Sequence, residues 1–271
     1  MQGAPRAKIC CIVGGITIQL ITTINHKFIR EVLNAMEERT NKIHEGKAKI
    51  IYATHDPNQV IMYFKDEATA RNGEKKGTIQ DKGIINNKIS TYFFKLLKDR
   101  GIDNHYIGTP DARDMLVKKL EMIPLEVVVR NVFAGSLAAR FGKEEGTPLS
   151  MPIVEFYFKC DELNDPLINR YHAIALGIAT LTELNQIEHL AFSINAIFKE
   201  VLGAKNVDII DFKTEYGRDG KGNVLLGDEI SPDNCRFWDK DTKQRLDKDV
   251  FRHDLGSPEE AYQEILRRLT L

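Results

Sequence analysis

The sequence predicts an α+β or mixed α/β fold arranged in two layers or lobes. A strand hairpin opens the pattern near residue 42, strands and helices are mixed after it, and a helix closes the chain. Strands followed by mixed elements indicate sheets covered by helices. With 271 residues, 42% hydrophobic and 28% charged, the chain can bury the core of one large domain or of two packed subdomains.

The first half is expected to be rich in strands. Residues 48–54 and 59–64 carry β-branched and aromatic side chains around a turn-like segment, so they predict an antiparallel hairpin. Residues 84–99 place apolar side chains near helical spacing, and Gly101 marks the predicted end of that helix. Further strands are expected at 104–107, 114–119 and 125–131.

The second half mixes both element types. Apolar residues every three to four positions predict one long helix over 173–202, ended by Gly203. The other expected elements are a short helix at 136–141 ended by Gly142, strands at 153–159, 207–213 and 224–230, and a helix at 258–269. A boundary between two lobes is expected near residue 120.

The bulk charge and the cysteines exclude several classes of protein. A formal net charge of -1 gives no global basic field, so neither a nucleic acid nor a membrane surface is an expected partner. None of the cysteines shows the Cys-x-x-Cys spacing of a zinc or redox site. Free thiols in a reducing cytoplasm are therefore expected for Cys10, Cys11, Cys160 and Cys235.

The N-terminal segment is expected to lie outside the folded unit. Residues 9–24 are mostly apolar, but they are interrupted by polar residues and fall short of the ~20 apolar residues of a spanning helix. A second methionine, Met36, opens a stretch of ordinary globular sequence. We therefore expect Met36 to be the native start and residues 1–35 to be an upstream extension.

A glycine and two lysines lie at the entrance to the first predicted hairpin. Gly46 lets the backbone approach a ligand closely, and Lys47 and Lys49, two positions apart on a strand, would point to the same side. Two ammonium groups on one face suit a polyphosphate. The alternative is a solvated strand edge that is protected by lysine.

Acidic residues close two neighbouring apolar strands. Asp211, Lys213 and Glu215 alternate, so they project to one side, and Asp228 ends the next strand. Charges at such places are costly unless they are paired or ligated. Carboxylates from two strands, together with a nucleotide, can hold Mg²⁺. The alternative is a cross-strand salt bridge such as Lys213 with Asp228.

Two further positions suit anionic ligands. Arg130 leaves a buried strand just before Ser136 opens a short helix, and a guanidinium fork beside a helix N-terminus can hold a phosphate or a carboxylate. Ser136 could equally be only an N-cap. Arg236 follows the turn at Pro232 and Asp233 and is expected near the acidic cluster, with an ion pair to Asp233 as the alternative.

These segments together closely resemble the SAICAR synthetase (phosphoribosylaminoimidazole-succinocarboxamide synthase) family of de novo purine biosynthesis. The resemblance runs in the family order from about residue 42 to the C-terminus, and residues 1–35 lie outside it. The matching segments are EGKAKIIYAT (45–54), KGIINNKIS (82–90), MIPLEVVVRNVFAGSLAARFGKEEGTPL (122–149), NDPLIN (164–169), DIIDFKTEYGRD (208–219) and LLGDEISPDNCRFWDKDT (225–242).

The resemblance implies a two-lobed α+β fold. A β-rich lobe at 36–120 would cover the nucleotide and is related in the family to ATP-grasp and kinase-like folds, and an α/β lobe at 121–271 would hold the metal and substrate site. It implies a ligase that joins L-aspartate to carboxyaminoimidazole ribonucleotide (CAIR), giving SAICAR, ADP and phosphate. ATP as co-substrate, Mg²⁺ and a homodimer are implied as well.

The resemblance also assigns roles to individual residues. It implies that ATP is bound by Gly46, Lys47, Ala48, Lys49, Lys82, Lys213, Glu215 and Asp228. Glu215 and Asp228 are also the implied metal ligands, and Asn86 to Lys88 line the cleft with Lys82. The implied substrate residues are Arg130, Ser136, Asp233 and Arg236. Lys213 and Asp211 are the candidate catalytic residues, with Asp211 the candidate general base for the amine of aspartate.

Two other functions compete with the ligase. Asp211-Phe212-Lys213 superficially resembles the Asp-Phe-Gly of kinases, but no His-Arg-Asp loop precedes it. Dependence of ADP release on aspartate separates the two. A nucleotide sensor or RNA-binding protein is the second alternative; the near-neutral charge and the lack of an aromatic RNA-binding signature oppose RNA.

Overall fold

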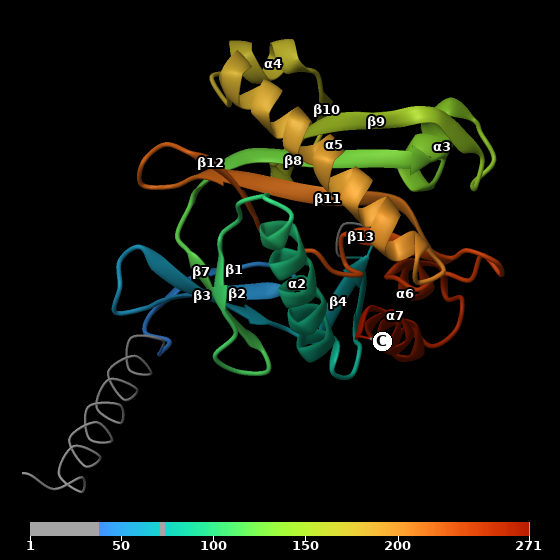
Figure 1. Cartoon of the computed structure of the whole chain (residues 1–271), viewed down its shortest axis with the longest axis horizontal. Coiled ribbons are helices and arrows are strands. Elements are labelled where there is room, and N and C mark those ends of the chain that lie inside the picture. The colour runs from blue at the N-terminus through green and yellow to red at the C-terminus, as the bar shows by residue number, and fades with distance from the viewer. Residues whose placement is uncertain (1–37, 71–73, 271) are drawn as a thin grey trace, which may run out of the picture.

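The structure is a computed structural model that describes residues 38–70 and 74–270. The predictions for residues 1–35 and for Met36 therefore lie outside the described residues. Within these ranges the chain forms antiparallel sheets and helices, as predicted for an α+β fold (Figure 1). No helix of the described residues is long and apolar enough to cross a membrane.

The first sheet is built from the N-terminal part of the chain. Its five strands run in the order β1-β2-β3-β7-β6, all antiparallel. Their bounds are β1 Lys42–Glu45, β2 Lys49–Ala53, β3 Gln59–Phe64, β6 Tyr106–Gly108 and β7 Asp114–Lys118. The predicted hairpin is confirmed in β2 and β3. A separate hairpin, β4 (Glu67–Ala70) with β5 (Lys75–Thr78), was not predicted.

The second sheet comes from the C-terminal part. Its order is β10-β9-β8-β11-β12, and β13 also pairs with β11, again all antiparallel. The bounds are β8 Glu121–Val132, β9 Pro148–Phe158, β10 Leu167–Ile168, β11 Val207–Arg218, β12 Val224–Gly227 and β13 Cys235–Asp239. The two long strands β8 and β11 lie side by side, so residues far apart in sequence face each other across them.

Helices cover these sheets. In Figure 1, α2 (Lys82–Asp99) lies in front of the first sheet and α5 (Leu181–Gly203) crosses in front of β8, β9 and β11. The C-terminal α7 (Pro258–Thr270) packs against α2, which ties the end of the chain to its N-terminal half. The shorter helices are α3 (Gly135–Phe141), η2 (Asp161–Leu163), α4 (Arg170–Ala175) and α6 (Asp249–His253). The predicted helices at 84–99, 136–141 and 258–269 are confirmed.

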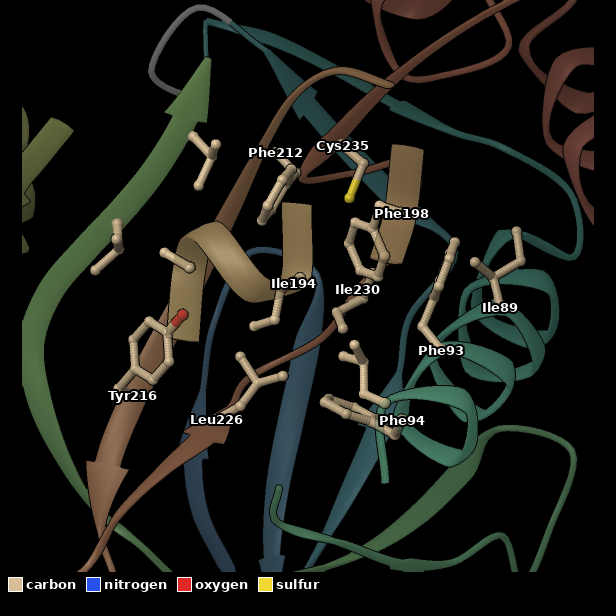
Figure 2. Packing of buried hydrophobic residues seen from close by; sticks show 14 of the residues in the cluster. Ile89, Phe93, Phe94, Ile194, Phe198, Phe212, Tyr216, Leu226, Ile230 and Cys235 are labelled. Carbon is tan, nitrogen blue, oxygen red and sulfur yellow. The ribbon is translucent and has the colours of Figure 1, made fainter. Parts of the chain in front are cut away.

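One apolar core runs through both halves of the molecule. Phe93 of α2 lies 4.7 Å from Phe198 of α5, measured between ring centroids, and 6.2 Å from Phe237 of β13. Phe198 in turn lies 5.1 Å from Phe212 of β11. Figure 2 shows these helices meeting the strands through buried aromatic and aliphatic side chains. Because α2 and α5 share this core, the sheets that they cover are held in a fixed relation.

The prediction of one helix over 173–202 was wrong. The chain leaves α4 at Ala175 and turns at Gly177, which has a φ of 67°, before α5 begins at Leu181. Thr180 is the N-cap of α5 and forms a capping box with Glu183. The apolar spacing continues across the break, so periodicity alone could not reveal it, whereas the Gly177 and Thr180–Glu183 signals could have.

A second strand was predicted too long. β12 ends at Gly227, three residues before the predicted end at Ile230. The next residue, Asp228, has a φ of 57°, a left-handed conformation that cannot continue a strand. The relation of the first sheet to ATP-grasp and kinase-like folds stays a prediction, as does the division into lobes at residue 120.

We expect Glu183→Gln to lower the free energy of unfolding by about 1 kcal/mol at neutral pH. The Glu183 carboxylate accepts hydrogen bonds from Arg218 Nε at 2.5 Å and from the Thr180 backbone N–H at 2.7 Å. The Arg218 bond, acting against burial, lowers the pKa of Glu183 to about 2. The folded state therefore binds this proton more weakly than the unfolded chain, whose glutamate pKa is about 4.3.

The stability difference between wild type and Glu183→Gln should therefore depend on pH. It should be fully present above about pH 5 and should shrink as pH falls toward 3. Urea unfolding of both proteins at several pH values between 7 and 3 measures it. A difference that stays constant over this range would show that the charge of Glu183 does not contribute to stability.

Candidate active site

The second sheet has one apolar face and one polar face. On one side Val127, Val129 and Phe212 pack into the core beneath α5. Side chains of β8, β9 and β11 alternate between the two sides, so the neighbouring positions point the other way. We call the other side the polar face; it carries Glu126 and Arg130 of β8, Glu155 and Tyr157 of β9, and Asp211, Lys213 and Glu215 of β11.

A row of alternating charges crosses this face. Asp211 lies directly opposite Arg130 in the ladder, and Arg130 Nη1 donates to Asp211 Oδ2 at 2.8 Å. Arg236 of β13 pairs with Asp211 from the other side, with Nη1 2.8 Å from the same Oδ2. We define the arginine row as these three residues with those that continue it at either end: Arg140, Glu155, Arg130, Asp211, Arg236, Asp249 and Arg252.

The ends of the row come from helices. Asp249 of α6 accepts from Arg236 Nε at 2.7 Å and from Arg252 Nη1 at 2.6 Å. Burial works against ionisation of Asp249, but Arg236 and Arg252 outweigh it and hold its pKa at about 2. Arg140 of α3 pairs with Glu155 at the other end. With four arginines and three carboxylates, the row carries one net positive charge, which suits an anionic ligand.

Ser136 joins the arginine row through Arg130. Its Oγ accepts from Arg130 Nη2 at 3.0 Å. The N-cap of α3 is Ala134 and makes no side-chain cap, so the alternative in which Ser136 is the N-cap is wrong. Gly135, with a φ of 50°, lies against Arg236, because a Cβ at this position would be only 2.5 Å from Arg236 Nη2. The start of α3 thus contacts both Arg130 and Arg236.

A second group of charges lies further along β11. We call it the lysine–carboxylate cluster: Lys49, Lys159 and Lys213 with Glu126, Glu215, Asp228 and Glu229. Lys213 Nζ donates to Glu126 at 2.7 Å and to Glu215 at 3.0 Å. Lys159 Nζ lies 2.5 Å from the other Glu215 oxygen. The alternative of a cross-strand salt bridge is confirmed in kind, because Lys213 of β11 pairs with Glu126 of β8. The partner named for it is different, because Asp228 pairs with Lys49.

Mutual attraction keeps this cluster charged. Burial alone would lower the pKa of Lys213, but the charges of Glu215, Asp228 and Glu126 raise it well above its usual value. Burial likewise opposes ionisation of Asp228, yet Lys49 and Lys213 lower its pKa. Both signs of charge are therefore present at neutral pH. Such a cluster can exchange its internal partners for phosphate oxygens and a cation.

The carboxylates of the cluster could supply only some of the ligands of a magnesium ion. Among the described residues, no group of three or more His, Cys, Asp or Glu side chains could hold a metal ion. Glu215 and Asp228 nevertheless offer hard carboxylate oxygens to the same lysines. Mg²⁺ is commonly held by one or two carboxylates with phosphate oxygens and waters completing its shell. The donor set thus fits Mg²⁺ together with a nucleotide.

The buried His105 contacts the backbone of Asp228. Its ring is buried against Phe94, with 5.0 Å between the ring centroids, and burial lowers its pKa to about 3, so the imidazole is neutral. The ring also hydrogen-bonds the backbone of Asp228. The backbone N–H of His105 donates to the carbonyl oxygen of Leu226 at 3.0 Å. This part of the chain therefore fixes the left-handed turn that presents the Asp228 carboxylate.

The glycine and lysine motif lies in a turn, not in a strand. Gly46, Lys47 and Ala48 join β1 to β2, and Lys49 is the first residue of β2. The prediction that Lys47 and Lys49 share one side of a strand was therefore wrong. Lys49 points into the lysine–carboxylate cluster, whereas the exposed Lys47 pairs with Asp161 of η2 at 2.9 Å. The turn thus reaches from the first sheet to the end of β9.

Lys82 and Asp233 form a separate buried group. Lys82 is 0% exposed and donates to Asp233 Oδ2 at 2.7 Å, while Tyr262 of α7 donates to Asp233 Oδ1 at 2.6 Å. Asp233 therefore lies with Lys82 and not with Arg236, and the predicted alternative pair between Asp233 and Arg236 is wrong. Of the residues expected beside Lys82, Asn86 and Asn87 are also buried, and Lys88 is exposed.

Several site residues were not found from the sequence. Glu126 alternates with Arg130 in the strand Leu125–Arg130, and Glu155 alternates with Tyr157 and Lys159, so the two-residue period could have revealed them. Asp249 and Arg252 carry no such signal. They are ordinary charged residues of a short helix, and only the packing of α6 beside β13 brings them to Arg236.

Comparison with known proteins identifies the same family as the sequence motifs, over most of the chain. The SAICAR synthetase family model matches residues 42–269. A phosphoribosylaminoimidazole-succinocarboxamide synthase of Clostridium botulinum (strain Alaska E43 / Type E3) is 53% identical over 233 residues, covering 86% of this chain and 99% of that protein. The corresponding protein of Coprothermobacter proteolyticus is 51% identical over 232 residues, covering 86% and 98%.

Solved structures show the same fold. The crystal structure of phosphoribosylaminoimidazole-succinocarboxamide synthase from Ehrlichia chaffeensis has a TM-score of 0.83 and 46% identity, covering 85% of this chain and 98% of that one. A SAICAR synthetase in complex with ADP has a TM-score of 0.82 and 52% identity, covering 84% and 97%. The fold and these matches thus define an enzyme of the ligase class. Within this class, the chain belongs to the SAICAR synthetase family.

We expect Gly135→Ala to destabilise the protein more than Gly142→Ala, by about 1 to 3 kcal/mol in the free energy of unfolding. Both glycines have a left-handed φ at the two ends of α3, 50° and 60°, so both substitutions carry backbone strain. Only at Gly135 would the new Cβ meet Arg236, whose guanidinium cannot move away without leaving Asp211 and Asp249.

Gly142→Ala is the matched control, because nothing lies within 4 Å of its added Cβ. Urea denaturation of both variants and of wild type measures the difference. Equal losses at the two positions would show that Arg236 is not held rigidly against the start of α3.

Proposed function

We propose that this protein joins L-aspartate to the carboxylate of CAIR at the expense of ATP, forming SAICAR, ADP and phosphate in purine biosynthesis. Family membership supports this reaction. The observation that carries the proposal further is that the arginine row and the lysine–carboxylate cluster share one face of one sheet. One group suits an anionic ribonucleotide and the other suits a nucleotide polyphosphate, and β11 connects them through Asp211, Lys213 and Glu215.

The lysine–carboxylate cluster is the proposed nucleotide site. Lys49 and Lys213 would release their carboxylate partners and bind phosphate oxygens, and the turn of Gly46, Lys47 and Ala48 would cover the phosphates. Glu215 and Asp228 would hold Mg²⁺, which supplies charge neutralisation on the transferring phosphoryl group. Lys82 was expected at this site, but its ammonium is buried against Asp233, so we propose that it supports the loop of Asp233 instead.

The arginine row is the proposed ribonucleotide site. Arg130, Ser136 and Arg236 would bind the anionic groups of CAIR. Arg236 Nη2 makes no hydrogen bond to any described residue, while Nε and Nη1 hold Asp249 and Asp211. Its free N–H groups are therefore available to a phosphate or a carboxylate. Asp233 was also expected to bind CAIR. Because it lies beside Lys82, we propose instead that it supports the loop that contains it.

The chemistry explains why both groups of charges are needed. A carboxylate is a poor acyl donor, because its leaving group would be oxide. Transfer of the γ-phosphoryl group from ATP to the CAIR carboxylate would give an acyl phosphate and ADP. The amine of aspartate would then attack the carbonyl carbon, and phosphate would leave. Lysines and arginines held in place stabilise the charge that develops at each step.

Asp211 and Lys213 have different proposed roles. Lys213 would neutralise the phosphoryl group while it is transferred. Asp211 was expected as a general base, but its oxygens accept three hydrogen bonds from Arg130 and Arg236. A base needs a free lone pair within reach of the amine. The geometry therefore favours Asp211 as the residue that orients the two arginines.

Closure over the site is a further part of the proposal. The acyl phosphate must be protected from water. The turn between β1 and β2 already reaches η2 through Lys47 and Asp161. We propose that this turn closes over the bound nucleotide, with residues 36–120 as the covering lobe. Residues 121–271 would be the lobe that carries the arginine row and all of the lysine–carboxylate cluster except Lys49.

The proposal includes a cytoplasmic homodimer. The free thiols of Cys160 and Cys235 support a reducing compartment. Exposed apolar side chains gather in the segment that includes β10 and α4, at Leu163, Leu167, Tyr171, Ile174, Leu176 and Leu181. Such a surface suits contact with a second copy. Sedimentation analysis of the purified protein tests this; a monomer at micromolar concentration would oppose it.

The test of function is ADP release by purified protein with Mg-ATP and CAIR, with and without L-aspartate. The proposed reaction requires that ADP release depends on both CAIR and aspartate and that SAICAR appears in step. ADP release that needs CAIR but not aspartate would point to a phosphoryl transfer enzyme of another kind.

We expect Lys213→Ala and Asp228→Asn each to lower kcat at least about 100-fold, in variants that still fold but have a lower free energy of unfolding, because a buried charged partner is left unpaired. Each removes one charge of the lysine–carboxylate cluster without opening a cavity in the apolar core. Lys243→Ala is the control, because Lys243 makes an exposed ion pair with Asp208. Circular dichroism and thermal unfolding check the fold. Wild-type turnover by either variant would remove that residue from the proposed site.

A further inference from the structure

We propose that Glu155 is a positioning residue for the ribonucleotide site: it orients Arg130 and joins Arg140 to it. No sequence pattern assigned a role to Glu155, and it would not itself bind an anionic substrate. The inference rests on the proposed function, because it concerns the site assigned to CAIR.

Glu155 is buried in the middle of the polar face. It lies on β9 opposite Val128 of β8, with a relative exposure of 9%. A carboxylate in such a place is costly unless several donors satisfy its oxygens. The donors that satisfy the Glu155 carboxylate therefore indicate its role.

Three donors converge on Glu155. Its Oε2 accepts from Arg130 Nε at 3.0 Å and from the Tyr157 hydroxyl at 2.9 Å, and its Oε1 accepts from Arg140. Tyr157 OH also accepts from Arg130 Nη2 at 3.2 Å. Glu155 and Tyr157 thus engage one edge of the Arg130 guanidinium, and Asp211 engages the other side through Nη1.

These contacts fix the plane of the guanidinium. A guanidinium that is held at two edges keeps one orientation, whereas one held only at Asp211 could rotate about that contact. The orientation matters because Nη2 donates to Ser136 at the start of α3. Without Glu155, Arg130 would lose its alignment with Ser136 and with Arg236, and the anionic substrate would meet a disordered set of donors.

Glu155 also connects α3 to the sheet. Arg140 belongs to the last turn of α3 and is the outer end of the arginine row. The ion pair between Arg140 and Glu155 therefore holds α3, and with it Ser136, against the polar face. One carboxylate thus positions an arginine of the sheet and the helix that carries the substrate-binding hydroxyl.

The test is steady-state kinetics of Glu155→Gln with CAIR, ATP and aspartate each varied in turn. The amide keeps the size of the side chain but removes its charge and one acceptor. We expect the KM for CAIR to rise about tenfold, with the KM for ATP within about twofold of wild type, because the lysine–carboxylate cluster makes no hydrogen bond or ion pair with Glu155 among the described residues.

Glu264→Gln is the matched control. The Glu264 carboxylate of α7 also accepts hydrogen bonds from two arginines, Arg267 and Arg268, but it lies outside the polar face. It should leave every KM unchanged. A general loss of stability in Glu155→Gln would lower the active fraction, and with it the apparent kcat, without changing any KM. An unchanged KM for CAIR, or equal rises in the KM for CAIR and the KM for ATP, would overturn the proposal.

Tyr157→Phe tests the positioning role of Glu155 if Glu155→Gln does not fold. It removes only the hydroxyl that bridges Glu155 and Arg130, so it should fold and should raise the KM for CAIR about threefold with no change for ATP. An unchanged KM for CAIR in this variant would overturn the proposal. If wild type forms no SAICAR, the proposed function fails first; if it does and the CAIR constants do not change, only the role of Glu155 fails.

Discussion

The architecture of the site depends on one constraint: charges buried on one face of a sheet must satisfy one another. Asp211 is the centre of this arrangement, because it accepts from Arg130 of β8 and from Arg236 of β13 while lying on β11 between them. Removing one partner of a buried pair leaves an uncompensated charge, at a cost of about 3 to 5 kcal/mol. The register of three strands is thereby linked to the geometry of the guanidinium groups.

The same strands build the core and the site. Phe212 points into the core, where its ring lies 5.1 Å from that of Phe198 of α5, while the next residue, Lys213, points to the polar face. A shift of β11 by one residue would exchange these two sets of side chains. The apolar packing beneath α5 therefore selects the register, and the register in turn places Asp211, Lys213 and Glu215 beside their partners. Packing on one face determines the chemistry available on the other.

The sequence predicted what depends on local pattern and missed what depends on tertiary packing. The alternation of Asp211, Lys213 and Glu215 correctly placed them on one side of a strand. The first hairpin and the helices at 84–99, 136–141 and 258–269 were also confirmed. The break at Gly177 and the turn at Lys47 were missed, because apolar and charged periodicity continued across them. Asp249 reaches Arg236 only through the position of α6, which no periodicity in the sequence encodes.

The lysine–carboxylate cluster explains how such a site can be stable and still bind a ligand. Lys49 and Lys213 are held by Asp228, Glu229, Glu126 and Glu215, so their charges are satisfied without a nucleotide. Phosphate oxygens can replace these carboxylates at the lysines only if the released carboxylates gain another positive partner. In the proposed nucleotide site, a divalent cation that enters with the nucleotide would supply it. Binding of the phosphates and binding of the metal would then be energetically coupled, because each would satisfy the charges that the other sets free.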